Sequence, residues 1–117
     1  MIQATLTNIH TATAKLIDLM TDVNIGNTVD WLPHFDVIDA GLTTLRKSSI
    51  DSPIAPALYR VCDRATPERV EVLRRWFEAS DRHDLTAVWM ESDTAMAVLT
   101  IISCATIYAM NTIALLN

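Results

Sequence analysis

Glycine is scarce in this sequence: the 117 residues include two glycines and four prolines. A β-sandwich or β-barrel of this length needs many turns, and turns depend on Gly, Pro, Asn and Asp. A few long helices with short connections need far fewer of these residues. The composition therefore predicts an all-α protein, a small bundle of about five helices in a single domain spanning residues 1–117.

Cysteine is equally scarce, since Cys62 and Cys104 are the only two. Two cysteines are too few for a disulfide framework. Each lies among apolar residues, which favours buried free thiols, with a single disulfide between them as the alternative. The opening segment, Met1 to Thr13, lacks a basic region and a continuous apolar run. We therefore expect no secretory signal there.

Positive charge is sparse as well. Nine Lys and Arg residues stand against fourteen Asp and Glu residues, which gives a net charge of −5. A nucleic-acid surface needs clustered basic side chains that neutralise several phosphates at once. The basic residues here are dispersed, and most have acidic neighbours. We expect no nucleic-acid partner.

Recognisable site chemistry is also lacking. A helical metal site needs three or four ligands at helical spacing, and the sequence offers only the pair Asp30 and His34. His10 and His83 stand apart from it. GxSxG, HExxH, P-loop and CxxC motifs do not occur. We expect no catalytic residue, no metal and no cofactor, and a protein that is not an enzyme.

Apolar residues recur at spacings of three and four in four segments, which is the period of helices with one buried face. The expected core positions are Ile2, Leu6, Ile9, Thr13, Leu16, Met20 and Val23; Leu32, Phe35, Ile38, Leu42 and Leu45; Ile54, Leu58, Val61 and Cys62; and Val70, Leu73, Trp76 and Phe77.

The boundaries of these helices follow from local signals. Asn24, Gly26 and Asn27 favour an end to the first helix. Asp30 is expected to cap the second, with Pro33 in its first turn. Ser52-Pro53 and Thr66-Pro67 predict the starts of the third and fourth helices, because proline suits the first helical position. Two polar connections are expected, at residues 48–52 and 80–84.

The segment from Thr94 to Asn117 contains no Asp, Glu, Lys, Arg or His. A stretch of this length and polarity can span a bilayer or form the buried central helix of a bundle. Ser92-Asp93 can cap it, although one unbroken helix from about Leu85 is also allowed. Glu91 and Asp93 are interpreted as helix-start acids rather than catalytic carboxylates.

Two sides of this last helix differ. One side carries Val98, Ile102, Ala105, Ala109 and Leu116, with Ile113 beside them, and the other carries Thr100, Ser103, Cys104 and Asn111. Ala105 and Ala109 form a pair of small residues that lets another helix approach closely. Polar residues within a bilayer oppose insertion, so the buried helix is favoured over the membrane anchor.

Candidate interaction residues come from three groups. Trp31, Trp76 and Trp89 lie in or beside apolar stripes; large aromatics pack cores, and they also anchor interfaces. Arg74 and Arg75, with Arg69, form a short basic patch that either stays solvated near Glu68, Glu71 and Glu78 or binds an acidic partner. Ala105 and Ala109 complete the set as a helix–helix contact.

The layout of amphipathic helices around one strongly apolar helix resembles compact Bcl-2-type bundles, including short viral ones. The Asn-Trp-Gly-Arg signature of that family does not occur, and Asn24-Ile25-Gly26-Asn27 does not replace it. The resemblance implies an apoptosis regulator as a minor alternative.

The leading hypothesis is a cytoplasmic, non-enzymatic interaction or assembly protein that acts through apolar helix faces. Because 50% of the residues are hydrophobic, more than so small a domain readily buries, we expect a homodimer. The alternative is a tail-anchored adaptor, with the residues before Ser92 in the cytosol and Thr94–Asn117 in a membrane.

Overall fold

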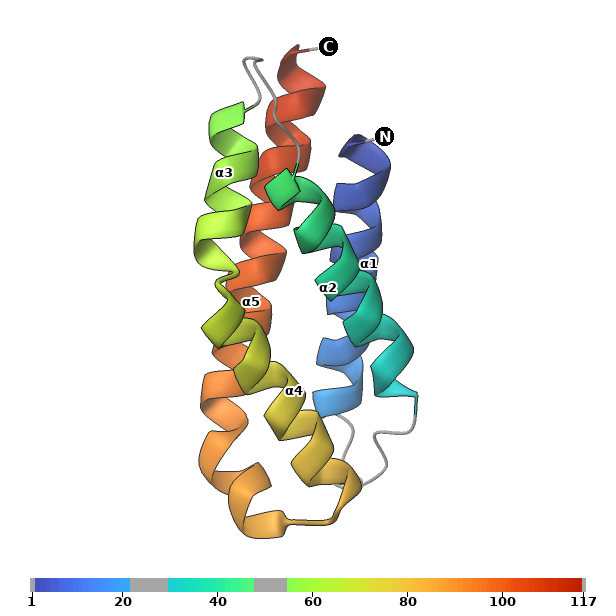
Figure 1. Cartoon of the computed structure of the whole chain (residues 1–117), viewed down its shortest axis with the longest axis vertical. Helices are drawn as coiled ribbons and strands as arrows, with labels where there is room; N and C mark the ends of the chain where they lie inside the picture. The colour runs from blue at the N-terminus through green and yellow to red at the C-terminus, as the bar shows by residue number, and fades with distance from the viewer. Residues whose placement is uncertain (1, 22–29, 48–54, 117) are drawn as a thin grey trace.

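The computed structural model describes residues 2–21, 30–47 and 55–116, and within these ranges the chain is helical with no strand (Figure 1). The five helices are α1 (Ile2–Thr21), α2 (Trp31–Lys47), α3 (Ala55–Arg64), α4 (Pro67–Asp81) and α5 (Leu85–Leu116). The predicted all-α fold is confirmed. The bundle is elongated, with extents of 45 × 22 × 20 Å.

α5 is the longest helix, with 32 residues, and runs the length of the molecule. It contacts α1, α3 and α4, with α3 and α4 following one another along it, as Figure 1 shows. α2 packs mainly on α1 and also contacts α3 and α4. Buried apolar side chains from all five helices form one hydrophobic cluster.

α1 and α2 pack tightly against each other at Gly41. A Cβ atom at this position would lie 2.5 Å from Cγ1 and 2.8 Å from Cδ1 of Ile9, whose side chain is fully buried. Such a separation is shorter than any ordinary van der Waals contact. Glycine in the interior of α2, which weakens a helix, therefore has a packing reason.

The start of α4 agrees with its sequence signal. Thr66 has extended backbone angles, and its side-chain oxygen accepts a hydrogen bond from the Arg69 amide at 3.3 Å. Pro67 is the first helical residue. α2 also begins where predicted, with Pro33 in its first turn. Asp30, however, has φ 70°, whereas a capping residue ordinarily has extended backbone angles. The expected signals at residues 24–27 and 52–53, and the connection at 48–52, lie outside the described residues.

α5 is unbroken from Leu85, which confirms that alternative, and the separate start at Ser92-Asp93 is wrong. The Ser92 hydroxyl instead donates to the Val88 carbonyl oxygen, one turn earlier. The true start lies at Asp84, whose Oδ1 accepts from the Ala87 amide at 3.2 Å. The connection before it is shorter than predicted, because Ser80 and Asp81 still belong to α4.

Most of the predicted core positions that lie within the described residues are buried, with instructive exceptions, whereas Val23 and Ile54 lie outside those residues. Leu32 is 50% exposed, and its neighbour Trp31 occupies the core instead. Leu116 is exposed at the end of α5. Both cysteines are free as expected, but neither is fully buried. Cys104 lies on the exposed side of α5, and Cys62, beside buried Val61, is half-buried at the edge of the core-facing stripe of α3.

The surroundings of α5 differ most from the expectation. A bundle-centre helix would be covered on most sides, yet only 39% of its most apolar 18-residue window is buried. Val98, Ile102 and Ala109 face the core, while the opposite side of the helix is open. α5 therefore forms one outer side of the bundle, and Asp93 is the only charged residue on its uncovered face.

Candidate protein-binding face

Exposed apolar side chains gather on α5. Of the ten large hydrophobic side chains exposed among the described residues, seven belong to this helix: Leu85, Trp89, Met90, Ile107, Tyr108, Leu115 and Leu116. Single exposed hydrophobic residues are common on soluble proteins, whereas their concentration on one element marks an interaction surface.

We define the α5 face as the exposed residues Trp89, Met90, Asp93, Ala97, Thr100, Cys104, Ile107 and Tyr108. Their spacings of three and four, with two adjacent pairs at the ends, place them on one side of the helix. Asp93 is the only charged member. The middle of the face is built from the small side chains of Ala97, Thr100 and Cys104, and its two ends carry the large ones.

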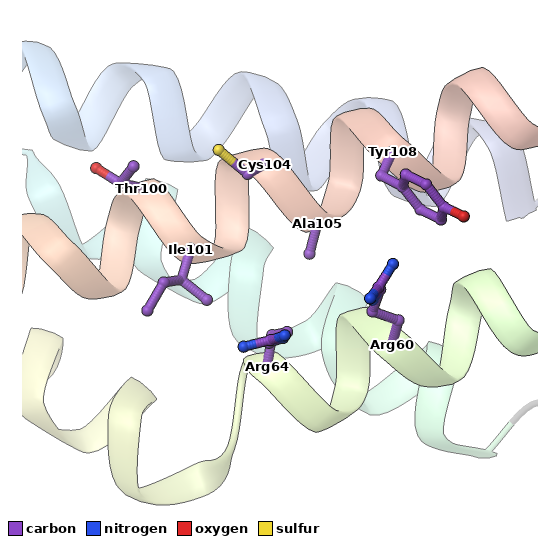
Figure 2. Close-up of a pocket in the computed structure, with 7 residues that line it drawn as sticks. All are labelled: Arg60, Arg64, Thr100, Ile101, Cys104, Ala105 and Tyr108. Atoms are coloured by element: carbon purple, nitrogen blue, oxygen red, sulfur yellow. The ribbon is translucent and has the colours of Figure 1, made fainter.

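A groove runs between the C-terminal half of this face and α3 (Figure 2). Its lining residues are Arg60, Arg64, Thr100, Ile101, Cys104, Ala105 and Tyr108. Ile101 and Ala105 point toward α3, from which Arg60 and Arg64 point back toward α5. The groove is thus apolar along α5 and positively charged along α3.

Arg60 stacks on the aromatic member of the groove. Its guanidinium carbon lies 5.1 Å from the centroid of the Tyr108 ring. A cation over an aromatic face at this distance is attracted by the ring electrons, by ~0.5–1 kcal/mol at exposed sites. This contact holds Arg60 beside the α5 face.

The charged groups around the face have no ion-pair partners within the described part of the chain. The ion pairs found there join Arg74 to Glu71 and Glu78 on α4. Arg60 and Arg64 form no ion pair with a described carboxylate, and Asp93 forms none with a described cation. The α5 face therefore has an acidic group in one half and two guanidinium groups beside the other.

The three tryptophans lie in two environments. Trp31 and Trp76 are each 6% exposed and pack against Phe77, with ring centroids 5.4 and 5.0 Å away. Both indole N–H groups donate inside the fold, Trp31 to Asp81 Oδ2 at 2.5 Å and Trp76 to the Val88 carbonyl oxygen at 3.0 Å. Trp89 is 68% exposed and is the one tryptophan on the surface.

The predicted arginine patch divides in two. Arg74 is held by Glu71 and Glu78, and its hydrogen bond lowers the pKa of Glu71 below the usual value and raises its own. Arg75 is exposed and lines a hollow with Arg82 and Glu91 near the start of α5. Neither arginine lines the groove between α3 and α5.

Ala105 and Ala109 are buried, at 7% and 0% exposure. Ala105 also lines the groove toward α3, so the small pair does lie on the packed side of α5. Sequence reasoning missed Arg60, Arg64 and Tyr108. The i, i+4 spacing of the two arginines placed them on one face of α3, but only the tertiary packing brings that face to Tyr108.

Reactive and metal-binding groups are few in the described ranges. Burial raises the pKa of the Cys62 thiol, an effect that nearby Arg46 partly opposes. The residues described contain no group of three or more His, Cys, Asp or Glu side chains able to hold a metal ion.

Comparison of the chain with protein-family models, with curated proteins and with solved structures found no match. The α5 face and the groove beside it are therefore the features from which a function can be inferred.

Proposed function

We propose that this chain is a non-enzymatic, cytoplasmic interaction or assembly protein whose binding surface is the α5 face together with the groove along α3. The observation that carries the proposal is the concentration of exposed large hydrophobic side chains on α5. Water at such a surface is released when a partner covers it, with a gain of ~25 cal/mol per Å² of apolar area.

The make-up of the face suits protein recognition. Trp89 and Tyr108 supply large, stiff aromatic side chains at its two ends, and Arg60 lies beside the second. Trp, Tyr and Arg are the residues that most often dominate binding energy at interfaces. The small residues between them allow a partner helix to approach closely.

A membrane-anchored adaptor is the second candidate, because α5 is long and apolar enough to cross a bilayer. Insertion has a cost in this fold. Val98, Ile102 and Ala109 would have to leave the core, and the apolar stripes of α1, α3 and α4 would lose the helix they contact. This cost favours the interaction protein.

Purification of the full-length chain without detergent, followed by light scattering and liposome flotation, distinguishes the two candidate functions. The proposal predicts a soluble, folded protein that stays at the bottom of the gradient. A chain that needs detergent and floats with liposomes would overturn it and support the anchor.

Ile102→Lys provides a second test. Ile102 is fully buried, so an unpaired ammonium at this position should unfold the bundle. In a tail-anchored protein the same change would release a folded domain from the membrane. A folded, soluble variant with an unchanged melting temperature would contradict the packing of α5 in the core.

A further inference from the structure

We infer that the partner of the α5 face is a second copy of this chain, bound so that the two α5 helices run antiparallel across a twofold axis. This inference rests on the proposed function and names the partner of the same surface. It follows from the unequal halves of the face, which complement each other only when the two copies point in opposite directions.

The N-terminal half carries Trp89, Met90 and the carboxylate of Asp93. The C-terminal half carries Cys104 and Tyr108, with the guanidinium groups of Arg60 and Arg64 beside them. An antiparallel twofold pairing brings each N-terminal half against the partner's C-terminal half. Two identical acidic-to-basic contacts then form from one surface, as a closed symmetric dimer requires.

The small residues set the register. If the axis passes midway between Ala97 and Thr100, the pair can approach closely where the helices cross, since both side chains are small and exposed. With a rise of about 1.5 Å per residue, Asp93 lies about 8 Å before this midpoint and Cys104 about 8 Å after it. Asp93 of one copy therefore faces Cys104 of the other.

This register gives the charges partners. Arg64 and Arg60 line the groove that contains Cys104 and have no described carboxylate as an ion-pair partner. An opposing Asp93 meets them there, while Trp89 of one copy reaches Tyr108 of the other. A parallel pair would instead place the two Asp93 carboxylates side by side, which repel. An anionic lipid surface would attract the arginines and repel Asp93.

The geometry can be tested by cross-linking to the native Cys104. In a Cys62→Ser background, Asp93→Cys should yield a covalent dimer on mild oxidation, and mass spectrometry should identify a peptide joining positions 93 and 104. Glu91→Cys is the matched control, because Glu91 is also exposed but lies on a different side of α5. Only Cys104–Cys104 linkage, or cross-linking no greater than in the control, would overturn the antiparallel register.

A charge exchange tests the energetics without new cysteines. Asp93→Arg alone, or Arg60→Glu with Arg64→Glu, should each weaken dimerisation at least tenfold in sedimentation equilibrium. The triple variant carries both changes in each copy and should recover most of that loss, because the charges again oppose one another. A triple variant that dimerises no better than the weaker parent would contradict the proposed contacts. Circular dichroism of each variant serves as the control for correct folding.

Failure of this inference is distinguishable from failure of the proposed function. A detergent-free wild-type chain that remains a strict monomer at high micromolar concentration would overturn the homodimer and leave the α5 face available to another protein. A wild-type chain that floats with liposomes would overturn both.

Discussion

The indole N–H of Trp31 donates a hydrogen bond to Oδ2 of Asp81 at 2.5 Å, joining the first residue of α2 to the last residue of α4. The Trp31 ring also stacks on Phe77, one turn before Asp81, with the two rings inclined by 14°. One side chain thus contacts α4 through its face and its edge, which positions the start of α2 against the end of α4.

Asp81→Ala should destabilise the protein by ~1–3 kcal/mol, because it leaves the buried indole N–H of Trp31 without its acceptor. Removing a negative charge from the end of a helix offsets part of this loss, by ~0.3–1 kcal/mol. Urea unfolding measures the difference. Asp39→Ala, at an exposed position of α2, is the control and should change stability little. Equal stability of the two variants would show that the hydrogen bond contributes nothing.

Ala109→Leu should destabilise the fold by ~1–3 kcal/mol, because Ala109 is fully buried and three extra carbon atoms would overpack the core. Ala97→Leu makes the same change on the exposed side of the same helix and should leave the stability of the monomer nearly unchanged. Thermal unfolding of the two variants at low concentration provides the comparison. If Ala97→Leu were the more damaging change, the assignment of buried and exposed sides of α5 would be reversed.

The Glu71–Arg74 pair should make the stability of the protein depend on pH in the acidic range. Arg74 holds the pKa of Glu71 below its ordinary value of 4.5, so the carboxylate is favoured in the folded state. The resulting stabilisation is present above pH 4.5 and is lost as the pH falls through the lower pKa of the folded protein. Glu71→Gln should therefore flatten the stability profile below pH 4.5, as measured by urea titration at several pH values. A profile identical to that of the wild type would show that the pair adds no stability.

The two thiols should react at different rates with iodoacetamide. Burial raises the pKa of Cys62 and covers part of its side chain, whereas Cys104 is exposed. Alkylation proceeds through the thiolate, so Cys104 should be labelled first at pH 8. Peptide mass spectrometry of a time course gives both rates. Faster labelling of Cys62 would mean that α3 opens readily from the bundle.

The sequence was sufficient to predict the parts of the fold that depend on neighbours within one helix. Leu6, Ile9 and Leu16, for example, are buried because their spacing puts them on one side of α1, whichever helix covers it. Thr66-Pro67 likewise acts within a single turn, and the structure confirms it.

The predictions from the sequence fail where tertiary contacts determine which of two local arrangements forms. Trp31 and Leu32 are adjacent apolar residues about 100° apart around α2. Asp81 and Phe77, distant in the sequence, provide the hydrogen bond and the stacking contact that draw Trp31 inward. Ser92 could cap a helix or bond to its own helix, and the continuity of α5 determined the second outcome.

The groove could not be predicted from the sequence for the same reason. Arg60 and Tyr108 are far apart in the chain, and neither has a local pattern that indicates the other. The candidate surface therefore becomes apparent only from the packing of α3 on α5, whereas the lack of charge after Asp93 is evident from the sequence alone.

Because α5 is unbroken, the angular positions of all its residues around the helix axis are fixed relative to one another. The helix contains no break that could absorb a change in length, so deleting one residue between Ala97 and Thr100 would turn everything that follows by about 100° relative to everything before it. Ile102 and Ala109 would swing out of the core, and Cys104 and Tyr108 would leave the line of Met90 and Asp93. Insertion of seven residues, close to two full turns, would disturb that line by only about 20°. The fold of the monomer should therefore accept many substitutions at the exposed positions in the middle of α5, but a change in the number of its residues only when that change is close to a whole number of turns.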